Sequence, residues 1–366
     1  MTVRSAKNDK QFTIISELKK GDVRAKFSHK IDLVRKKPGN IPDGALPKKY
    51  HAMWYMKKIK NNNAAIRELV GQEFFRLLIP NHPKTRITND GASPSYVLSK
   101  EVPSFQTLDE IPQTIVKEHI QNHVYKGLGD VLVVSLLLNE IDLKFGNLGI
   151  DDQDHFIKID GDWCFARLTE QFKSHNFIIN EKGLRDLPFL FESYAFNWLD
   201  IILADTLKTS KIFDKDFSKD LYFRAEVNST ILRILILPDD LIKAFINSYI
   251  TGEDAANIYN EITQRKSALK EAALANKDFK EYVKSDPAKE TFINYRNYLQ
   301  NFKTTSKNHL VIDNLKNRLE QKFESLRKEK NNLFSLFPSL TLDKYSHNVN
   351  KMLGNDKAMQ SSYFKK

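Results

Sequence analysis

The chain has 366 residues, of which 41% are hydrophobic and 28% are charged. This composition is ordinary for a globular protein and leaves room for two or more folding units. The longest apolar stretch, residues 131–138, is too short to cross a bilayer, and no apolar segment of a secretory signal follows the first ten residues. Cys164 is the single cysteine and cannot form an intramolecular disulfide, so we expect a reducing, cytoplasmic environment.

The net charge of +11 is concentrated in one part of the sequence. Residues 1–60 contain 16 Lys and Arg against 5 Asp and Glu, and the two signs balance in the rest of the chain. Such an excess attracts phosphate groups, so we expect an inositol polyphosphate or an anionic membrane as a partner, with Arg35, Lys36 and Lys37 as candidate anion-binding residues. The alternative is a solvated, lysine-rich surface. No zinc-finger, helix-turn-helix or RNP pattern occurs, so we expect no nucleic-acid partner.

The first hundred residues are predicted to form strands and turns around one helix. Two β-favouring runs flank a turn at residues 20–22, which indicates a hairpin, and a loop rich in Pro and Gly follows over residues 36–49. A strand is predicted over residues 51–59 and a helix over residues 64–78, ending before Pro80. Two short strands come next, so the predicted order is three strands, one helix and two strands.

Helical patterns dominate after residue 106. Residues 115–138 are predicted to form one or two helices with a break near Gly127. Two short strands are predicted near residues 148–150 and 156–159, and beyond residue 188 nearly every segment has helical spacing. These elements together predict an α+β protein with a β-rich beginning and a helical remainder.

Residues 139–163 contain a combination of polar groups that suits phosphoryl transfer. Asp142, Lys144 and Asn147 form an Asp-Leu-Lys-x-x-Asn pattern, and Asp160 follows at the end of an apolar strand. Phosphoryl transfer needs a carboxylate that takes the proton of the attacking hydroxyl, an amide oxygen and a second carboxylate that hold magnesium, and a lysine that neutralises charge. The alternative is that Asp142 is a solvated loop carboxylate and Asn147 an ordinary turn residue. The combination of all four residues favours the catalytic interpretation.

The sequence DLKFGNLGI resembles the catalytic loop of the protein-kinase-like superfamily, and the sequence IDG at residues 159–161 stands where that superfamily has its DFG motif. With the strings LLIPNHPKT and IDGDW, the chain is most similar to HipA-type and phosphatidylinositol-kinase-type relatives, and among them to effector kinases of Legionella-like intracellular pathogens. The resemblance implies that Asp142 is the catalytic base, that Lys144 contacts the γ-phosphate, and that Asn147 and Asp160 bind the metal.

The resemblance also implies partners upstream of this loop. A strand lysine is expected to contact the nucleotide phosphates, and the sequence MWYMKKI supplies Lys57 or, one residue on, Lys58. A glutamate on the following helix is expected to pair with that lysine. Glu68 is preferred, with Glu73 as the alternative, because only one of the two can face the strand.

Two further assignments concern the nucleotide and the metal. The segment between the lobes is expected to contact the nucleotide through Ser99 and Glu101. Asp162 is an alternative to Asp160 as metal ligand, because the parity of an extended strand would place both side chains on one face.

The chain departs from the kinase pattern at several positions. No Gly-x-Gly-x-x-Gly precedes Lys57, so the loop at residues 39–44 is expected to cover the phosphates instead. Glu140 and Ile141 replace the His-Arg pair before the catalytic Asp, and the sequence has no Ala-Pro-Glu signature. Because Ile141 replaces the arginine that binds an activation-loop phosphate in many protein kinases, we expect activity that does not depend on such phosphorylation.

The resemblance implies a two-lobed protein-kinase-like α+β fold, with a small β-rich N-lobe over a helical C-lobe. ATP and Mg²⁺ or Mn²⁺ are expected between the lobes. We expect the N-lobe over residues 1–105, the C-lobe over residues 106–250, a helical extension over residues 251–345 and a flexible tail over residues 346–366.

Three functions are compatible with these residues. A protein Ser/Thr kinase of atypical type, acting as a bacterial effector on a protein substrate, is favoured because the motif carries Lys144. The first alternative is a phosphoinositide or small-molecule kinase, and the second is a nucleotide-binding pseudokinase or interaction module. An effector would act in a host cell cytosol, peripherally associated with a membrane.

Overall fold

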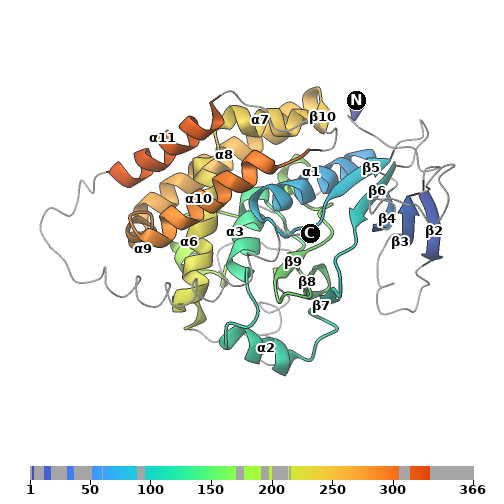
Figure 1. The fold of residues 1–366 in the computed structure, drawn as a ribbon, viewed down its shortest axis with the longest axis horizontal. Coiled ribbons are helices and arrows are strands. Elements are labelled where there is room, and N and C mark those ends of the chain that lie inside the picture. Colours follow the sequence, from blue (N-terminus) through green and yellow to red (C-terminus); the bar gives the residue numbers. More distant parts are fainter. Residues whose placement is uncertain are drawn as a thin grey trace, which may run out of the picture.

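The fold is described here from a computed structural model, which defines residues 2–3, 12–17, 31–36, 52–59, 61–88, 95–169, 177–190, 198–199, 213, 216–304 and 314–329. Within these residues the protein is α+β, as the sequence predicts, with a β-rich first part and a helical remainder. In Figure 1 the larger sheet lies at one side and the C-terminal helices at the other. The expected tail at residues 346–366, the loop at residues 39–44 and Lys37 lie outside the described residues.

The N-terminal part is an antiparallel sheet of five strands in the order β2-β3-β4-β6-β5. Its third strand is β4, and the helix α1 connects β4 to β5 along the chain. The predicted order of three strands, one helix and two strands is therefore confirmed. The elements are β2 (Phe12–Glu17), β3 (Ile31–Lys36), β4 (Met53–Ile59), α1 (Asn62–Leu78), β5 (Thr85–Thr88) and β6 (Ser95–Lys100).

Helix α1 ends at Leu78, as its sequence predicts, and begins at Asn62, two residues before the predicted start. The side chain of Asn61 accepts hydrogen bonds from the N–H groups of Asn63 (2.9 Å) and Ala64 (3.3 Å), which caps the helix. Pro80 follows the end of the helix and cannot continue it. Apolar side chains of α1 pack against one face of the sheet, where Ile59 and Val97 lie, and form one core with the helices of the second part.

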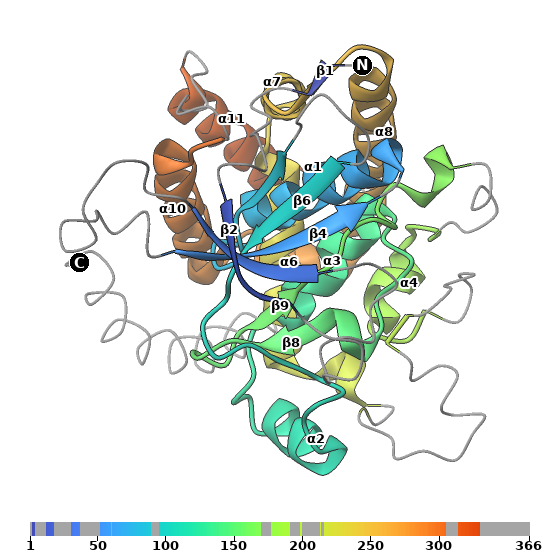
Figure 2. The same ribbon diagram turned by 90° about the vertical axis from the view of Figure 1, so that its right-hand side faces the viewer.

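A second, three-stranded antiparallel sheet lies below the first sheet in the view of Figure 2. Its strands are β7 (Gln106–Thr107), β8 (Leu148–Ile150) and β9 (Phe156–Lys158), and the 3-10 turn η5 (Phe145–Asn147) precedes β8. The predicted break near Gly127 is confirmed: α2 (Gln113–Gln121) ends before it, and α3 (Leu128–Leu138) begins after it. Gly127 has φ = +85°, which glycine adopts without steric cost.

The remaining described chain is helical and surrounds α3, which packs chiefly against α6 and also against α8 and α1. A short pair of strands joins the start of the chain to this helical part: β1 (Thr2–Val3) pairs with β10 (Ile250–Thr251), which lies between the helices Asp239–Asn247 and Glu253–Ala275. The helices are α4 (Glu181–Asp186), α6 (Leu221–Ile236), α7 (Asp239–Asn247), α8 (Glu253–Ala275), α9 (Lys277–Tyr282), α10 (Asp286–Asn301) and α11 (Leu315–Lys328), with short 3-10 turns η6 (Ala166–Leu168) and η8 (Phe217–Lys219). The three boundaries expected between the N-lobe, the C-lobe, the extension and the tail stay predictions.

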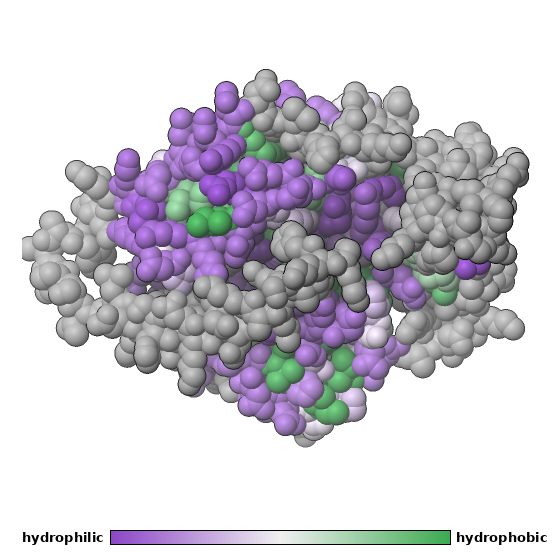
Figure 3. Space-filling model, viewed as in Figure 1, coloured by the Kyte–Doolittle hydropathy of each residue, from purple (hydrophilic) through white to green (hydrophobic). Residues whose placement is uncertain are grey.

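Most of the described surface in Figure 3 is hydrophilic, and hydrophobic residues gather around α2. Ile115 in the segment Gln113–Gln121 and Val124 just after it are more than a third exposed. Among the described residues, no helix has both the length and the apolar composition needed to cross a membrane.

Candidate active site

Lys57 lies at the centre of a cluster of charged side chains under α1. Residues on β4 alternate between the two faces of the sheet, so Lys57 is buried beneath α1 while Lys58 is exposed on the other face, 5.9 Å from the ring centre of Tyr96. The Nζ atom of Lys57 lies 2.6 Å from Oδ1 of Asp160 and 3.0 Å from Oε2 of Glu68. The structure therefore places Lys57, and not Lys58, where the expected strand lysine belongs.

Of the two candidate glutamates on α1, Glu68 faces Lys57 and Glu73 has other partners. Glu73 is fully buried and accepts hydrogen bonds from Arg76 (2.6 Å), from the N–H of Thr85 (2.6 Å) and from the hydroxyl of Tyr249. These contacts tie α1 to β5 and to the short segment between α7 and β10. Glu73 therefore has a structural role in this arrangement.

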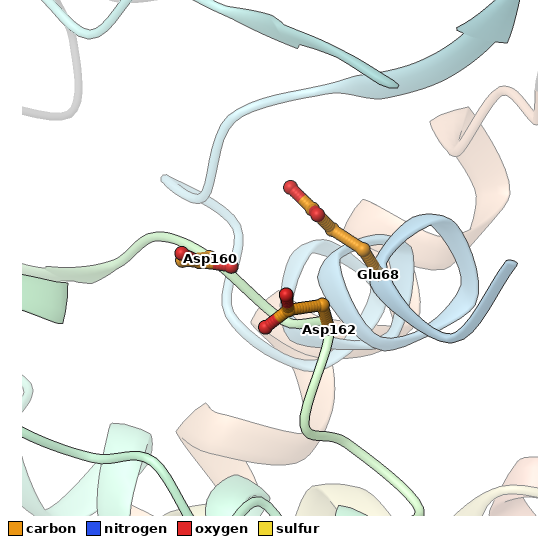
Figure 4. Close-up of side chains that lie close together, drawn as sticks. All are labelled: Glu68, Asp160 and Asp162. Carbon is orange, nitrogen blue, oxygen red and sulfur yellow. The ribbon is translucent and has the colours of Figure 1, made fainter. Parts of the chain in front are cut away.

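The loop after β9 brings Asp160 and Asp162 to the same cluster (Figure 4). Asp160 has φ = +61°, a left-handed conformation that Asp tolerates better than most residues. The side-chain amide of Gln72 on α1, with its oxygen toward the loop, accepts from the N–H groups of Asp160 (3.2 Å) and Gly161 (3.1 Å). Gly71 allows this close approach, because a Cβ atom there would lie 2.5 Å from Sγ of Cys164.

Three carboxylates share one ammonium group in this cluster, and the pKa values of Glu68 and Asp160 shift in opposite directions. Burial raises the pKa of Glu68 to about 8, with Lys57 opposing and Asp160 and Asp162 adding to the shift. Burial would raise the pKa of Asp160 too, but the cations of Lys57 and Lys158 outweigh it and hold that pKa below its usual value. For Lys57, burial alone would lower the pKa, and the surrounding carboxylates, Asp160 first, raise it instead. Asp160 is therefore the ionised partner of Lys57.

The Asp142–Asn147 loop is closed by its own side chains. The amide nitrogen of Asn147 donates to both the carbonyl and the carboxylate of Asp142, at 2.9 Å each. The Nζ atom of Lys144, whose side chain is 43% exposed, lies 2.8 Å from Oδ2 of Asp142. The N–H of Ile159 donates to the carbonyl of Asn147 (2.9 Å), so the β8–β9 hairpin sets Asn147 directly beside the start of the Asp160 loop.

A buried ion pair that the sequence did not reveal links the two loops. Glu140 and Lys158 are both fully buried, and Oε2 of Glu140 lies 3.2 Å from Nζ of Lys158. The other oxygen of Glu140 accepts from the N–H of Asp142 (2.9 Å), while Nζ of Lys158 donates to the carbonyl of Asp160. Burial raises the pKa of Glu140 and would lower that of Lys158, but the Glu140 charge raises the Lys158 pKa. Two features of the sequence could have pointed to this ion pair. One is the single lysine in the apolar strand Phe-Ile-Lys-Ile, and the other is the glutamate that stands before Asp142, where the kinase pattern has His-Arg.

The remaining predicted residues lie near the cluster or outside the described residues. Ser99 pairs with Tyr55 across β4 and β6 and lies on the same face of the sheet as Lys57, and the N–H of Glu101 donates to the carbonyl of Met53 (3.0 Å). Arg35 is exposed at the end of β3, also on that face. The side chain of Lys36 and the whole of Lys37 lie outside the described residues, so the anion-binding group stays a prediction.

The donor set suits a hard divalent cation. Glu68, Asp160 and Asp162 each offer a carboxylate oxygen, and these oxygens lie within 4.8 Å of one another (Figure 4). Oxygen ligands from carboxylates are the ones that Mg²⁺ and Mn²⁺ prefer. The cluster can therefore hold a metal ion, with Lys57 beside it to contact a further anionic group.

Comparison with known proteins gives a family match and similar solved structures. The family described as the LepB N-terminal domain matches residues 77–214, which is less than half of the chain. Among solved structures, the crystal structure of a Helicobacter pylori proinflammatory kinase, CtkA, is similar with 14% sequence identity and a TM-score of 0.38, over 66% of this chain and 89% of that chain. No curated protein matches.

Proposed function

We propose that the chain is an ATP-dependent kinase whose active site lies between the five-stranded sheet and the Asp142–Asn147 loop. The observation that carries the proposal is the contact of Lys57 with both Glu68 and Asp160, at 3.0 and 2.6 Å. In protein kinases a lysine on the third strand must pair with a glutamate on the following helix, and an aspartate after a later strand must hold magnesium. Here the lysine lies on the third strand of the sheet and the glutamate on the helix that follows it.

The chain's own groups have distinct tasks in this proposal. Lys57 contacts the nucleotide phosphates, while Asp160 and Asn147 hold the divalent metal, with Asp162 as a further carboxylate in reach. Bound Mg-ATP supplies the phosphoryl group and screens its charge. An oxygen of the Asp142 carboxylate accepts the proton of the attacking hydroxyl. Asn147 donates to that carboxylate and orients it, and Glu140 accepts from the backbone N–H of Asp142.

The proposed acceptor is a Ser or Thr hydroxyl of a protein, and the proposed setting is that of a bacterial effector in a host cytosol. Lys144 is partly exposed beside Asp142, where its ammonium group can neutralise charge on the transferred phosphoryl group. This position supports the kinase proposal. Transfer to a phosphoinositide would require the same roles of Asp142, Asn147 and Asp160. The experiment therefore has to distinguish a protein acceptor from a lipid acceptor.

The test is a single set of incubations of the full chain with labelled ATP and Mg²⁺. The acceptors are the chain itself, a general protein substrate and vesicles that contain phosphoinositides, and Asp142→Asn is the matched inactive control. Label on protein supports the proposed acceptor, and label on lipid alone replaces it with the phosphoinositide. Nucleotide binding without transfer to any acceptor would overturn the kinase proposal in favour of a binding module.

A further inference from the structure

Helix α1 is held at its C-terminal end by donors from distant helices. The last carbonyls of any helix lack partners within it and must find them elsewhere. Here the hydroxyl of Tyr298 donates to the carbonyl of Arg76 (2.5 Å), and the hydroxyl of Tyr295 donates to that of Leu77 (3.2 Å). Arg233 on α6 donates to the carbonyl of Leu78 (2.6 Å).

Both tyrosines come from α10, more than two hundred residues after the carbonyls that they contact. Burial raises the pKa of each hydroxyl, so both keep the proton that they donate. The segment after α10 adds to the contact: the guanidinium of Arg76 lies 4.1 Å from the ring centre of Phe302 and donates to the carbonyl of Lys303 (3.0 Å). In Figure 1 the end of α10 reaches α1 from the side opposite the sheet.

The same helix carries two residues that shape the candidate site. Glu68 pairs with Lys57, and Gln72 accepts from the backbone of Asp160 and Gly161. Whatever fixes the position of α1 therefore fixes the strand lysine and the Asp160 loop together. In protein kinases the corresponding helix must be in place for activity.

We propose that residues 286–304 act as a built-in clamp that holds α1 in the position where Glu68 meets Lys57. The clamp consists of Tyr295, Tyr298 and Phe302, which act through α1 and do not touch the reacting groups. The inference rests on the proposed function, because its consequence is a catalytically competent Lys57–Glu68 pair. It makes the helical extension a positioning element of the active site.

The test removes the two hydroxyls and keeps the rings. In Tyr295→Phe/Tyr298→Phe we expect kcat to fall about tenfold, the effect of two hydrogen bonds of about 0.7 kcal/mol each, while KM for ATP changes less. The matched control is Tyr282→Phe, which removes a buried hydroxyl that contacts the same helix α10, at Oγ1 of Thr291 (2.8 Å), but makes no contact with α1 among its described hydrogen bonds. It therefore separates the loss of a hydroxyl contact to α10 from the loss of the contacts between α10 and α1. Tyr282→Phe should keep the wild-type kcat.

A double-mutant cycle separates positioning from general destabilisation. If the clamp acts through Glu68, the two Tyr→Phe changes should have little further effect on kcat in a Glu68→Gln background. An equal fall in that background, or an equal fall in Tyr282→Phe, would overturn the proposal.

Hydrogen exchange tests the clamp independently of the kinase proposal. In Tyr295→Phe/Tyr298→Phe the amides of α1 should exchange faster than in Tyr282→Phe, whether or not the chain transfers phosphate. Unchanged exchange in α1 would overturn the clamp even in an active kinase. Faster exchange in a chain without any kinase activity would support the clamp and reject the proposed function.

Discussion

Nζ of Lys57 and Oδ1 of Asp160 lie 2.6 Å apart, although 103 residues separate them in the sequence. Lys57 comes from the third strand of the first sheet, and Asp160 from the loop after the last strand of the second. Their contact therefore joins the two parts of the molecule at one point. Because Glu68 lies 3.0 Å from the same ammonium, a change at any of the three residues should affect the other two.

Replacing the strand lysine should remove most of the activity. We expect Lys57→Met to lower kcat/KM for phosphoryl transfer by about a hundredfold or more, since positioning supplies most of the catalysis in this reaction. The measurement is steady-state kinetics at a temperature well below the melting point of the variant. Lys58→Met is the matched control and should keep its activity, because Lys58 lies on the other face of the sheet. A sensitive Lys58 and a tolerant Lys57 would contradict the assignment.

The metal assignment is tested by comparing two carboxylates of one loop. Asp160→Asn should abolish transfer and weaken magnesium-dependent nucleotide binding, and Asn tolerates the left-handed backbone at this position, so the fold is kept. Asp162→Asn should have a smaller effect, because Asp162 lies 3.6 Å from Lys57 against 2.6 Å for Asp160. Titration of nucleotide with and without Mg²⁺ measures both. If the Asp160 variant stayed active and the Asp162 variant lost transfer, the two roles would be exchanged.

The proposed base should affect turnover and leave nucleotide binding nearly intact. Asp142→Asn keeps an oxygen that can accept from the amide of Asn147 but removes the negative charge that takes up a proton. General-base catalysis contributes about 10²–10⁴-fold, so kcat should fall within that range. Rapid-quench measurement of the first turnover isolates the chemical step. A normal first turnover in this variant would exclude Asp142 as the base.

Part of the site follows from short sequence patterns. The Asp-Leu-Lys-x-x-Asn run and the Asp after an apolar strand locate two of its loops, because each loop takes its shape from its own residues. Strand parity in the sequence does not distinguish Lys57 from Lys58, because both faces of the strand carry apolar residues; the structure distinguishes them, with Lys57 buried and Lys58 exposed.

The supporting contacts have no such local signal. Gln72, the Glu140–Lys158 pair and the tyrosines of α10 reach their partners only through the packing of distant elements. A tyrosine that caps a helix more than two hundred residues away looks like any amphipathic helix residue in the sequence. The position of the expected anion-binding residues could not be predicted for a different reason. Net charge predicts attraction to phosphate, but it does not predict which side chains lie close together.

The stability of the fold should fall in mild acid because of His82. Its ring is buried against Phe75, and its Nε2 accepts from the N–H of Lys158 (3.1 Å). Burial, with the nearby Lys158 charge, lowers the pKa of His82 to about 3. The unfolded chain therefore binds a proton at His82 below about pH 6.5 while the folded chain does not, so stability present above pH 6.5 is lost as the pH falls toward 3.

The loss from this residue is at most about 1.4 kcal/mol per pH unit. Urea unfolding at pH 7 and pH 5 measures it in the wild type and in His82→Gln, which cannot take up the proton. His82→Gln should be less stable than the wild type at pH 7, and the difference should shrink at pH 5. A constant difference between the two pH values would show that His82 titrates normally in the folded chain.

Breaking the Glu140–Lys158 pair by changing one partner should lower the free energy of unfolding more than replacing both partners. Lys158→Met leaves the Glu140 charge fully buried without its cation, which typically costs about 3–5 kcal/mol of unfolding free energy. Glu140→Gln/Lys158→Met removes both charges and keeps an oxygen for the N–H of Asp142, so the double variant should be more stable than Lys158→Met alone. Turnover should stay low in both variants, because each loses the Lys158 ammonium that donates to the carbonyl of Asp160. Urea unfolding and kcat, measured on the same preparations, separate the two effects. A double variant with wild-type kcat would show that the pair only stabilises the fold and does not position the Asp160 loop.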